Sequence, residues 1–217
     1  MLRLSLFSLV LLLALGPAPV LADRTVIHAS AEEAQPLLAG MRAPEFTLRT
    51  VSGEPFTFSP DALEKPVVLT FFRGGWCPYC NLHLSEMRHA EEQLKALGFD
   101  VWFISADRPE LLVDSLEEPD IGYTLYSDGE LSATRAFGIA FSLDDETYES
   151  YKNYGVDLEQ TSGQDHHALP VPATFIIGQD GVINFAYVNP SYDTRLAPEV
   201  LLAAAEAYKK GADRRLK

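Results

Sequence analysis

The clearest hydrophobic pattern in the chain lies between residues 67 and 98. The run VVLTFF at 67–72 is apolar at almost every position, which is typical of a strand buried on both faces. Beyond residue 80 the pattern changes, because apolar residues now recur at steps of three and four. These steps predict a helix that ends at Gly98, with an apolar stripe made of Leu84, Met87, Ala90, Leu94 and Leu97.

Both cysteines of the sequence, Cys77 and Cys80, lie between this strand and this helix. Extending the apolar stripe backwards places Cys80 on the buried face of the helix and Cys77 at its start. Pro78 suits the first helical position, where no backbone N–H is needed. The sequence therefore predicts an exposed Cys77 at a helix N-terminus, with a shielded Cys80 beneath it.

The rest of the chain alternates between strand and helix patterns. Apolar and polar residues alternate on both sides of the turn at Ser52 and Gly53, which predicts a β-hairpin over 46–58. We expect further strands at 99–107, 123–126 and within 173–188, and further helices at 109–116, 131–137 and 197–208. This alternation is typical of an α/β fold. The segment 139–169 has no clear period, and we interpret it as a partly helical insertion that could lie over the active site.

The first residues predict a targeting segment, and the acidic charge of the chain argues against nucleic acid as a partner. Arg3, an apolar core and a small-residue cleavage site predict a signal peptide over 1–22. We therefore expect an exported protein, periplasmic or secreted, with no membrane segment after cleavage. The sequence holds 17 basic and 31 acidic residues, so nucleic acid is not an expected partner. The remaining ranges are interpreted as an N-terminal extension (23–42), one domain (43–210) and a basic tail (211–217).

The C-x-x-C spacing of Cys77 and Cys80 favours redox chemistry. Unpaired N–H groups and the helix dipole stabilise a thiolate at a helix N-terminus, and the pKa of such a cysteine can fall to about 7 or lower. A structural disulfide is the first alternative, although closing a loop of about four residues contributes only roughly 2 kcal/mol. A zinc site is the second, and it would need two further ligands from histidines or carboxylates. We expect no metal and no cofactor other than the redox-active cysteine pair.

The arrangement of motifs resembles the thioredoxin fold. A strand precedes the segment WCPYC at a helix start, and a later VPAT segment precedes two antiparallel strands. The resemblance implies a central mixed sheet flanked by helices, an N-terminal hairpin, and the insertion before the proline strand. It also implies a cis peptide bond before Pro172. In such proteins this loop faces the nucleophilic cysteine, so Val171 and Pro172 are predicted to dock the substrate or the electron donor.

More closely, the chain resembles the peroxiredoxin-like branch, the alkyl hydroperoxide reductase/thiol-specific antioxidant group. The segments APEFTL, KPVVLTFFRGGWCPYC, a strand ending in SAD, ATRAFGI and VPATFII carry this resemblance. It implies a thiol-dependent peroxide reductase in which Cys77 attacks the peroxide and becomes a sulfenic acid. Cys80 would then resolve it to a disulfide, which an external thiol donor reduces. The protein would act as a monomer or a homodimer.

The chain departs from that family's pattern ahead of the cysteines. Where the family has a proline and a threonine or serine, this sequence has Thr70 and Gly74, so the hydroxyl that binds peroxide is missing. Arg73 is the nearest residue that could supply positive charge in its place. We expect Trp76 to cover the disulfide. The family's later active-site arginine cannot be placed from the sequence.

Two alternative functions follow from these departures. The C-P-Y-C motif also matches glutaredoxin, so the alternative enzyme is a thioredoxin-like oxidoreductase acting on protein disulfides. The other alternative is a redox-sensitive binding protein without turnover. His83 and His89 are predicted to be solvated on the polar side of the cysteine helix. His166 and His167 could approach Cys77 and lower its pKa.

Overall fold

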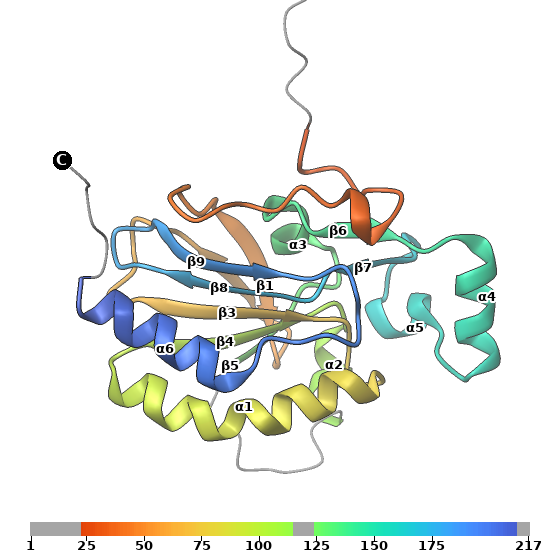
Figure 1. The fold of residues 1–217 in the computed structure, drawn as a ribbon. Helices are drawn as coiled ribbons and strands as arrows, with labels where there is room; N and C mark the ends of the chain where they lie inside the picture. The colour runs from red at the N-terminus through yellow and green to blue at the C-terminus, as the bar shows by residue number, and fades with distance from the viewer. Residues whose placement is uncertain (1–22, 115–123, 212–217) are drawn as a thin grey trace, which may run out of the picture.

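The apolar run at 67–72 forms the central strand of a seven-stranded sheet (Figure 1). The computed structural model describes residues 23–114 and 124–211. Strand β3 (Val67–Phe72) pairs in parallel with β4 (Asp100–Ser105), which pairs in parallel with β5 (Thr124–Ser127). The other pairs of this sheet are antiparallel. The order is β2-β1-β5-β4-β3-β8-β9, which adds β1 (Phe46–Thr50), β2 (Pro55–Phe58), β8 (Ala173–Ile177) and β9 (Ile183–Val188).

The sheet is mixed, as the thioredoxin-like fold requires, and the predicted hairpin is β1 and β2. Parallel pairing is confined to the centre, because only β3, β4 and β5 are joined by helical crossovers. The helices are α1 (Pro78–Ala96), α2 (Pro109–Asp114), α3 (Ser132–Ala136), α4 (Asp145–Asn153), α5 (Leu158–Ser162) and α6 (Pro198–Lys209).

The side chains of β3 alternate between two hydrophobic cores. Leu69 and Phe71 point into the core that also holds Phe137 of the segment after α3. Val68 and Phe72 point into the second core, which contains the apolar stripe of α1 together with Leu201 of α6. Figure 1 shows α1 and α6 side by side on one face of the sheet, with α3 on the other. The prediction of a strand buried on both faces is therefore confirmed. Because β3 is held between the two cores, the position of the cysteine turn that follows it is fixed as well.

The insertion has secondary structure of its own. It contains β6 (Ala140–Ser142), α4, α5 and β7 (Ala168–Pro170), and β6 pairs with β7 in a small antiparallel sheet. Helices α4 and α5 lie at one end of the large sheet (Figure 1). Tyr148 and Leu158 of these helices pack in a third core, against which Trp76 is placed. The insertion is thus attached to the cysteine turn, as the sequence suggested.

The N-terminal extension packs against the domain rather than standing apart from it. His28 donates its backbone N–H to Ala140 at 2.9 Å, and Leu37 donates to Phe137 at 3.1 Å. Leu37 is buried in the first core. Of the predicted terminal segments, 1–22 and 212–217 lie outside the described residues. In the part of the chain that the structure describes, no helix is long and apolar enough to cross a membrane.

Candidate active site

The cysteine pair lies where the hydrophobic pattern placed it, at the start of α1. Cys77 is the N-cap residue and Pro78 begins the helix. The Cys77 carbonyl accepts hydrogen bonds from the backbone N–H groups of Cys80, at 3.0 Å, and Asn81, at 3.1 Å. Both cysteines are free thiols. The burial of Cys80 is confirmed, but the predicted exposure of Cys77 is wrong, because only 2% of its surface is accessible.

Cys77 is buried because the turn ahead of it folds back over the helix start. Trp76 is half-buried and packs against the core cluster that contains both cysteines. Trp76 also contacts Tyr151 of α4, with ring centroids 5.7 Å apart. Trp76 thus lies beside the cysteines as free thiols, and its predicted position over a disulfide stays a prediction. Through Tyr151 the insertion contacts the cysteine turn.

The two thiols are electrostatically unequal. The pKa of Cys77 is lowered to about 6, chiefly by a hydrogen bond from the Cys80 thiol and further by the Cys80 backbone N–H and the charges of Arg73 and Arg195. Together these outweigh the opposing effect of burial. The pKa of Cys80 is raised well above its ordinary value, first because its thiol donates to Cys77 and then because it is buried. Near neutral pH, Cys77 is the thiolate and Cys80 the thiol.

Arg73 is a buried cation enclosed by aromatic rings. Only 3% of its surface is exposed. Its guanidinium carbon lies 5.3 Å from the ring centroid of Trp76, 5.3 Å from that of Tyr151 and 4.8 Å from that of Tyr192. It donates to the Tyr151 hydroxyl, whereas its Nε has no hydrogen-bond partner. Among the described residues no ion pair joins Arg73 to a carboxylate, and its charge is one of those that lower the pKa of Cys77.

A second arginine, which the sequence did not identify, contacts Cys80. Arg195 lies in the segment between β9 and α6, and its Nη2 is 3.6 Å from Cys80 Sγ. Its Nη1 donates to the backbone carbonyls of Thr194, at 3.2 Å, and Tyr192. These bonds hold the guanidinium against the sulfur. Since 115 residues separate Arg195 from Cys80 in sequence, no local pattern could reveal the contact.

Gly74, at the position of the family's threonine or serine, has no room for a side chain. A Cβ atom built there would lie 2.2 Å from Trp76 Nε1 and 2.7 Å from Asp107 Oδ1. Asp107 Oδ2 in turn accepts a hydrogen bond of 2.7 Å from the Gly75 backbone N–H. The indole and the carboxylate therefore occupy the space that a threonine side chain would take.

This crowding predicts the result of restoring the hydroxyl. Gly74→Thr should displace Trp76 and lower the free energy of unfolding by about 1–3 kcal/mol, as overpacking commonly does. The reaction of Cys77 with peroxide should not become faster, because the new hydroxyl cannot reach its place without moving the indole. Thermal unfolding and single-turnover kinetics of both proteins check this. A stable variant with a faster peroxide reaction would contradict it.

The proline loop differs from the thioredoxin pattern. The cis peptide bond expected before Pro172 is absent, since the described residues contain no cis peptide bond. The chain runs directly from β7 into β8, and the Val171 N–H donates to Ile139 O at 2.8 Å while Pro172 O accepts from Asn189 N at 3.1 Å. These bonds occupy the backbone groups that were expected to dock a substrate.

The side chains of this loop have separate positions. Val171 is fully buried, so it packs rather than docks. Pro172, by contrast, lines a cavity of about 250 Å³ together with Arg73, Tyr151 and Tyr192. Pro172 therefore lies beside Arg73, whereas Val171 lies in the hydrophobic core.

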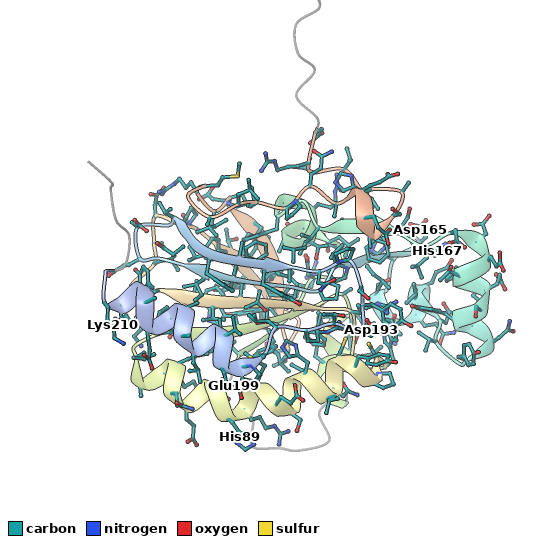
Figure 2. All side chains as sticks on the ribbon, in the orientation of Figure 1. His89, Asp165, His167, Asp193, Glu199 and Lys210 are labelled. Carbon is teal, nitrogen blue, oxygen red and sulfur yellow. The ribbon has the colours of Figure 1, made fainter. Side chains whose placement is uncertain are left out.

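The histidines are mostly structural. His83 was expected to be solvated, but it is 4% exposed and its Nε2 lies 3.1 Å from the Leu196 carbonyl. Burial lowers the pKa of His83 to about 4, so it is neutral. His89 is exposed, as expected, on the outer side of α1 (Figure 2).

His166 and His167 are engaged within the insertion. Nε2 of His166 lies 2.8 Å from Gly129 O, and Nε2 of His167 lies 2.6 Å from Glu159 Oε1. His167 also stacks on Tyr148 at 3.7 Å between centroids. Figure 2 shows His167 beside the insertion helices. Neither histidine lowers the pKa of Cys77. Among the described residues, no group of three His, Cys, Asp or Glu side chains is placed to hold a metal ion.

Comparison with known proteins agrees with the site geometry. Residues 39–186 match the model of the AhpC/TSA family. The chain belongs to this family. It is 33% identical over 104 residues to the peroxiredoxin Bcp of Escherichia coli K12 and 32% identical over 104 residues to a putative peroxiredoxin bcp of Haemophilus influenzae. Each match covers 48% of this chain and 66% of the relative, which is just under two thirds of its length.

Two solved structures share the fold. Peroxidoxin BcpB of Mycobacterium tuberculosis superposes with a TM-score of 0.59 at 20% identity, over 78% of this chain and 96% of that one. Peroxiredoxin 6 of Arenicola marina superposes with a TM-score of 0.65 at 17% identity, over 82% of this chain and 76% of that one. The sequence resemblance to peroxiredoxins and the expectation of a thioredoxin-like fold are therefore confirmed.

Proposed function

We propose that the protein is a thiol-dependent peroxide reductase in which Cys77 is the nucleophile. The main observation in support is the Cys77 thiol at a helix N-terminus, with a pKa lowered to about 6, in part by the charge of Arg73. A thiolate present at neutral pH is the reactive form towards peroxide. Membership of the AhpC/TSA family, and the peroxiredoxin names of the relatives, support the same reaction.

In the first step, the Cys77 thiolate attacks one peroxide oxygen. The S–O bond forms as the O–O bond breaks, and the leaving alkoxide or hydroxide takes a proton and departs as an alcohol or water. Arg73 stabilises the negative charge that develops on the leaving oxygen. Arg73 lines the cavity beside Pro172, and its Nε has no hydrogen-bond partner among the described residues.

In the second step, Cys80 attacks the Cys77 sulfenic acid. The S–S bond forms, the S–O bond breaks and water leaves. Arg195 contacts Cys80 Sγ and favours its thiolate while this happens. An external thiol then reduces the disulfide by exchange, which oxidises two donor thiols and returns both cysteines.

The competing function is thiol–disulfide exchange with protein disulfides. The specific observation in its favour is Gly74, which lacks the hydroxyl that binds peroxide in the family. Trp76 and Asp107 occupy the space where a side chain would lie. The experiment that separates the two functions is a stopped-flow titration of reduced protein with hydrogen peroxide and, in parallel, with an oxidised protein disulfide. Peroxide reduction no faster than that of a free thiol of equal pKa would reject the peroxidase function.

We also propose that the protein acts after export, in the periplasm or outside the cell. The support is the charged start, apolar core and cleavage site within residues 1–22. N-terminal sequencing of the protein from its native host should begin at Asp23. An intact Met1 on protein recovered from the cytoplasm would reject this compartment.

A further inference from the structure

Part of the N-terminal extension, residues 29–32, lines the cavity beside Arg73. This cavity has a volume of about 250 Å³, and Tyr151 and Tyr192 line it as well. The match to the AhpC/TSA family covers residues 39–186, so the extension contributes a wall from a segment that lies before the matched range. The wall is therefore a feature of this chain that the family model does not describe.

The wall is anchored to the start of the insertion by backbone hydrogen bonds at both of its ends. The His28 N–H donates to Ala140 O, and the Ser142 N–H donates to His28 O, both at 2.9 Å. The Gln35 N–H donates to Gly138 O, also at 2.9 Å. A Cβ atom at Gly138 would collide with the Gln35 carbonyl oxygen, and Gly138 has a φ of +71°, so this close approach requires glycine. The chain between His28 and Gln35 thus passes the cavity in a fixed position.

Arg73 joins the cavity to the cysteine turn. It lies four residues before Cys77, and its guanidinium carbon is 5.3 Å from the ring centroid of Trp76. Its charge is among those that lower the pKa of Cys77. A molecule in the cavity therefore lies against the arginine that is proposed above to stabilise the leaving oxygen.

The rest of the lining favours an uncharged organic group. Its apolar part includes the side chains of Phe141, Leu143, Pro172 and Pro190. Its acidic part consists of Glu32, which is exposed, and Asp144, which accepts from the Thr147 N–H at 2.8 Å and the Thr147 hydroxyl at 2.9 Å. Among the described residues no ion pair neutralises either carboxylate. The two carboxylates should therefore repel a ligand that carries a carboxylate of its own.

We propose that residues 29–32 select the substrate by shaping this cavity for a hydroperoxide that carries a compact, uncharged organic group. The hydroperoxide end lies towards Arg73, and the organic group contacts the apolar walls. The S–O bond to Cys77 forms as the O–O bond breaks, and the leaving alkoxide takes a proton and departs as an alcohol that keeps the organic group. Hydrogen peroxide has no organic group, so its reaction does not depend on this wall. The inference rests on the proposed peroxide reaction of Cys77.

The test narrows the cavity from the extension without changing the cysteine turn. Ala31→Leu and Ser30→Leu each add apolar volume at a lining position, and Ser30 makes no side-chain capping bond that the change would remove. Glu33→Leu is the matched control. It adds the same side chain in the same short helix, at an exposed residue that does not line the cavity. Thermal unfolding of each variant checks that it folds.

Single-turnover rates are measured for each protein with hydrogen peroxide and with cumene hydroperoxide. In Ala31→Leu and Ser30→Leu the rate with cumene hydroperoxide should fall at least about tenfold, as expected when a group no longer fits a hydrophobic pocket. The rate with hydrogen peroxide should change little. Glu33→Leu should keep both rates, so the ratio of the two rates reports on the wall and not on the reactivity of Cys77.

A binding measurement gives a readout that does not require turnover. Cumyl alcohol, the product of cumene hydroperoxide, is titrated into reduced protein and followed by ligand-observed NMR. Its affinity should fall at least about tenfold in Ala31→Leu and Ser30→Leu and stay the same in Glu33→Leu. The para-carboxylate of the same alcohol should bind the wild type more weakly, because Glu32 and Asp144 line the cavity.

Unchanged cumene hydroperoxide rates and unchanged alcohol binding in both leucine variants of the wall would overturn the proposal, and if one of them does not fold, the other decides. A wild type that binds no cumyl alcohol would also overturn it, and tighter binding of the carboxylate would reject an uncharged substrate. The proposed peroxidase function fails separately. A wild type that reacts with neither peroxide, yet binds the alcohol and loses this binding in the wall variants, would reject that function and leave the binding site standing.

Discussion

Replacing Cys77 with serine will abolish reaction with both peroxide and disulfide, whereas replacing Cys80 will leave the first attack in place. Cys77 carries the lowered pKa, and a serine hydroxyl has no comparable anion at neutral pH. In Cys80→Ala no donor remains at this position, so the Cys77 thiolate loses the hydrogen bond that lowers its pKa most, and the optimum of the first step should move to higher pH. Stopped-flow kinetics over a pH series measure both effects.

Mass spectrometry of the same variants identifies the species that accumulate. Cys80→Ser should stop at a Cys77 sulfenic acid with peroxide, or at a mixed disulfide with a thiol reagent, because no resolving thiol remains. Dithiothreitol should still restore the reduced form. An inert Cys80→Ser protein beside a reactive Cys77→Ser protein would reverse the assigned roles.

Arg73→Ala will slow peroxide attack at least about tenfold, which is at the low end for loss of a preorganised donor to developing charge. Reaction with a protein disulfide should change much less, because the leaving group there is a thiolate rather than an oxygen anion. Removing Arg73 also removes one of the charges that lower the pKa of Cys77. The pKa of Cys77 must therefore be titrated in each protein, and the second-order rate constants compared per thiolate.

Two control variants make this measurement specific. Tyr151→Phe removes the hydroxyl that accepts from Arg73 but keeps the ring 5.3 Å from the guanidinium carbon, so the cation should remain in place. Arg108→Ala removes an exposed arginine that forms an ion pair with Glu110. Neither should lower the thiolate-based peroxide rate as far as Arg73→Ala does. An unchanged rate in Arg73→Ala would remove Arg73 from the peroxide step.

The elements of the fold were predictable where their patterns are local. The apolar run at 67–72 and the stripe beginning at Leu84 specify β3 and α1, and the position of Cys80 follows from the same helical period. The end of α1 was also predictable, because Gly98 adopts a φ of +84°, which glycine tolerates best. These features depend on neighbours within a few residues.

Features made by distant segments could not be predicted in this way. Arg195 reaches Cys80 from beyond β9, and Asp107 reaches the cysteine turn because β4 lies beside β3. Trp76, next to the buried Cys77, packs against the insertion, where the sequence has no clear period and gave no element boundaries. The cis peptide expectation came from the thioredoxin pattern. It is wrong, because the described residues contain no cis peptide bond, and the backbone on either side of this bond pairs with Ile139 and Asn189.

The placement of the tryptophans on different cores has a consequence for optical measurements. The sequence contains two tryptophans. Trp76 lies against the cysteines, whereas Trp102 of β4 packs with Phe56 and Tyr126, at 5.3 Å from each ring centroid. Oxidation of the cysteines should change the fluorescence of Trp76 alone. The fluorescence of Trp102 should instead change when the part of the sheet that contains the β1–β2 hairpin unfolds. Spectra of Trp76→Phe and Trp102→Phe would assign the two signals, so one chain carries separate intrinsic reporters of redox state and folding.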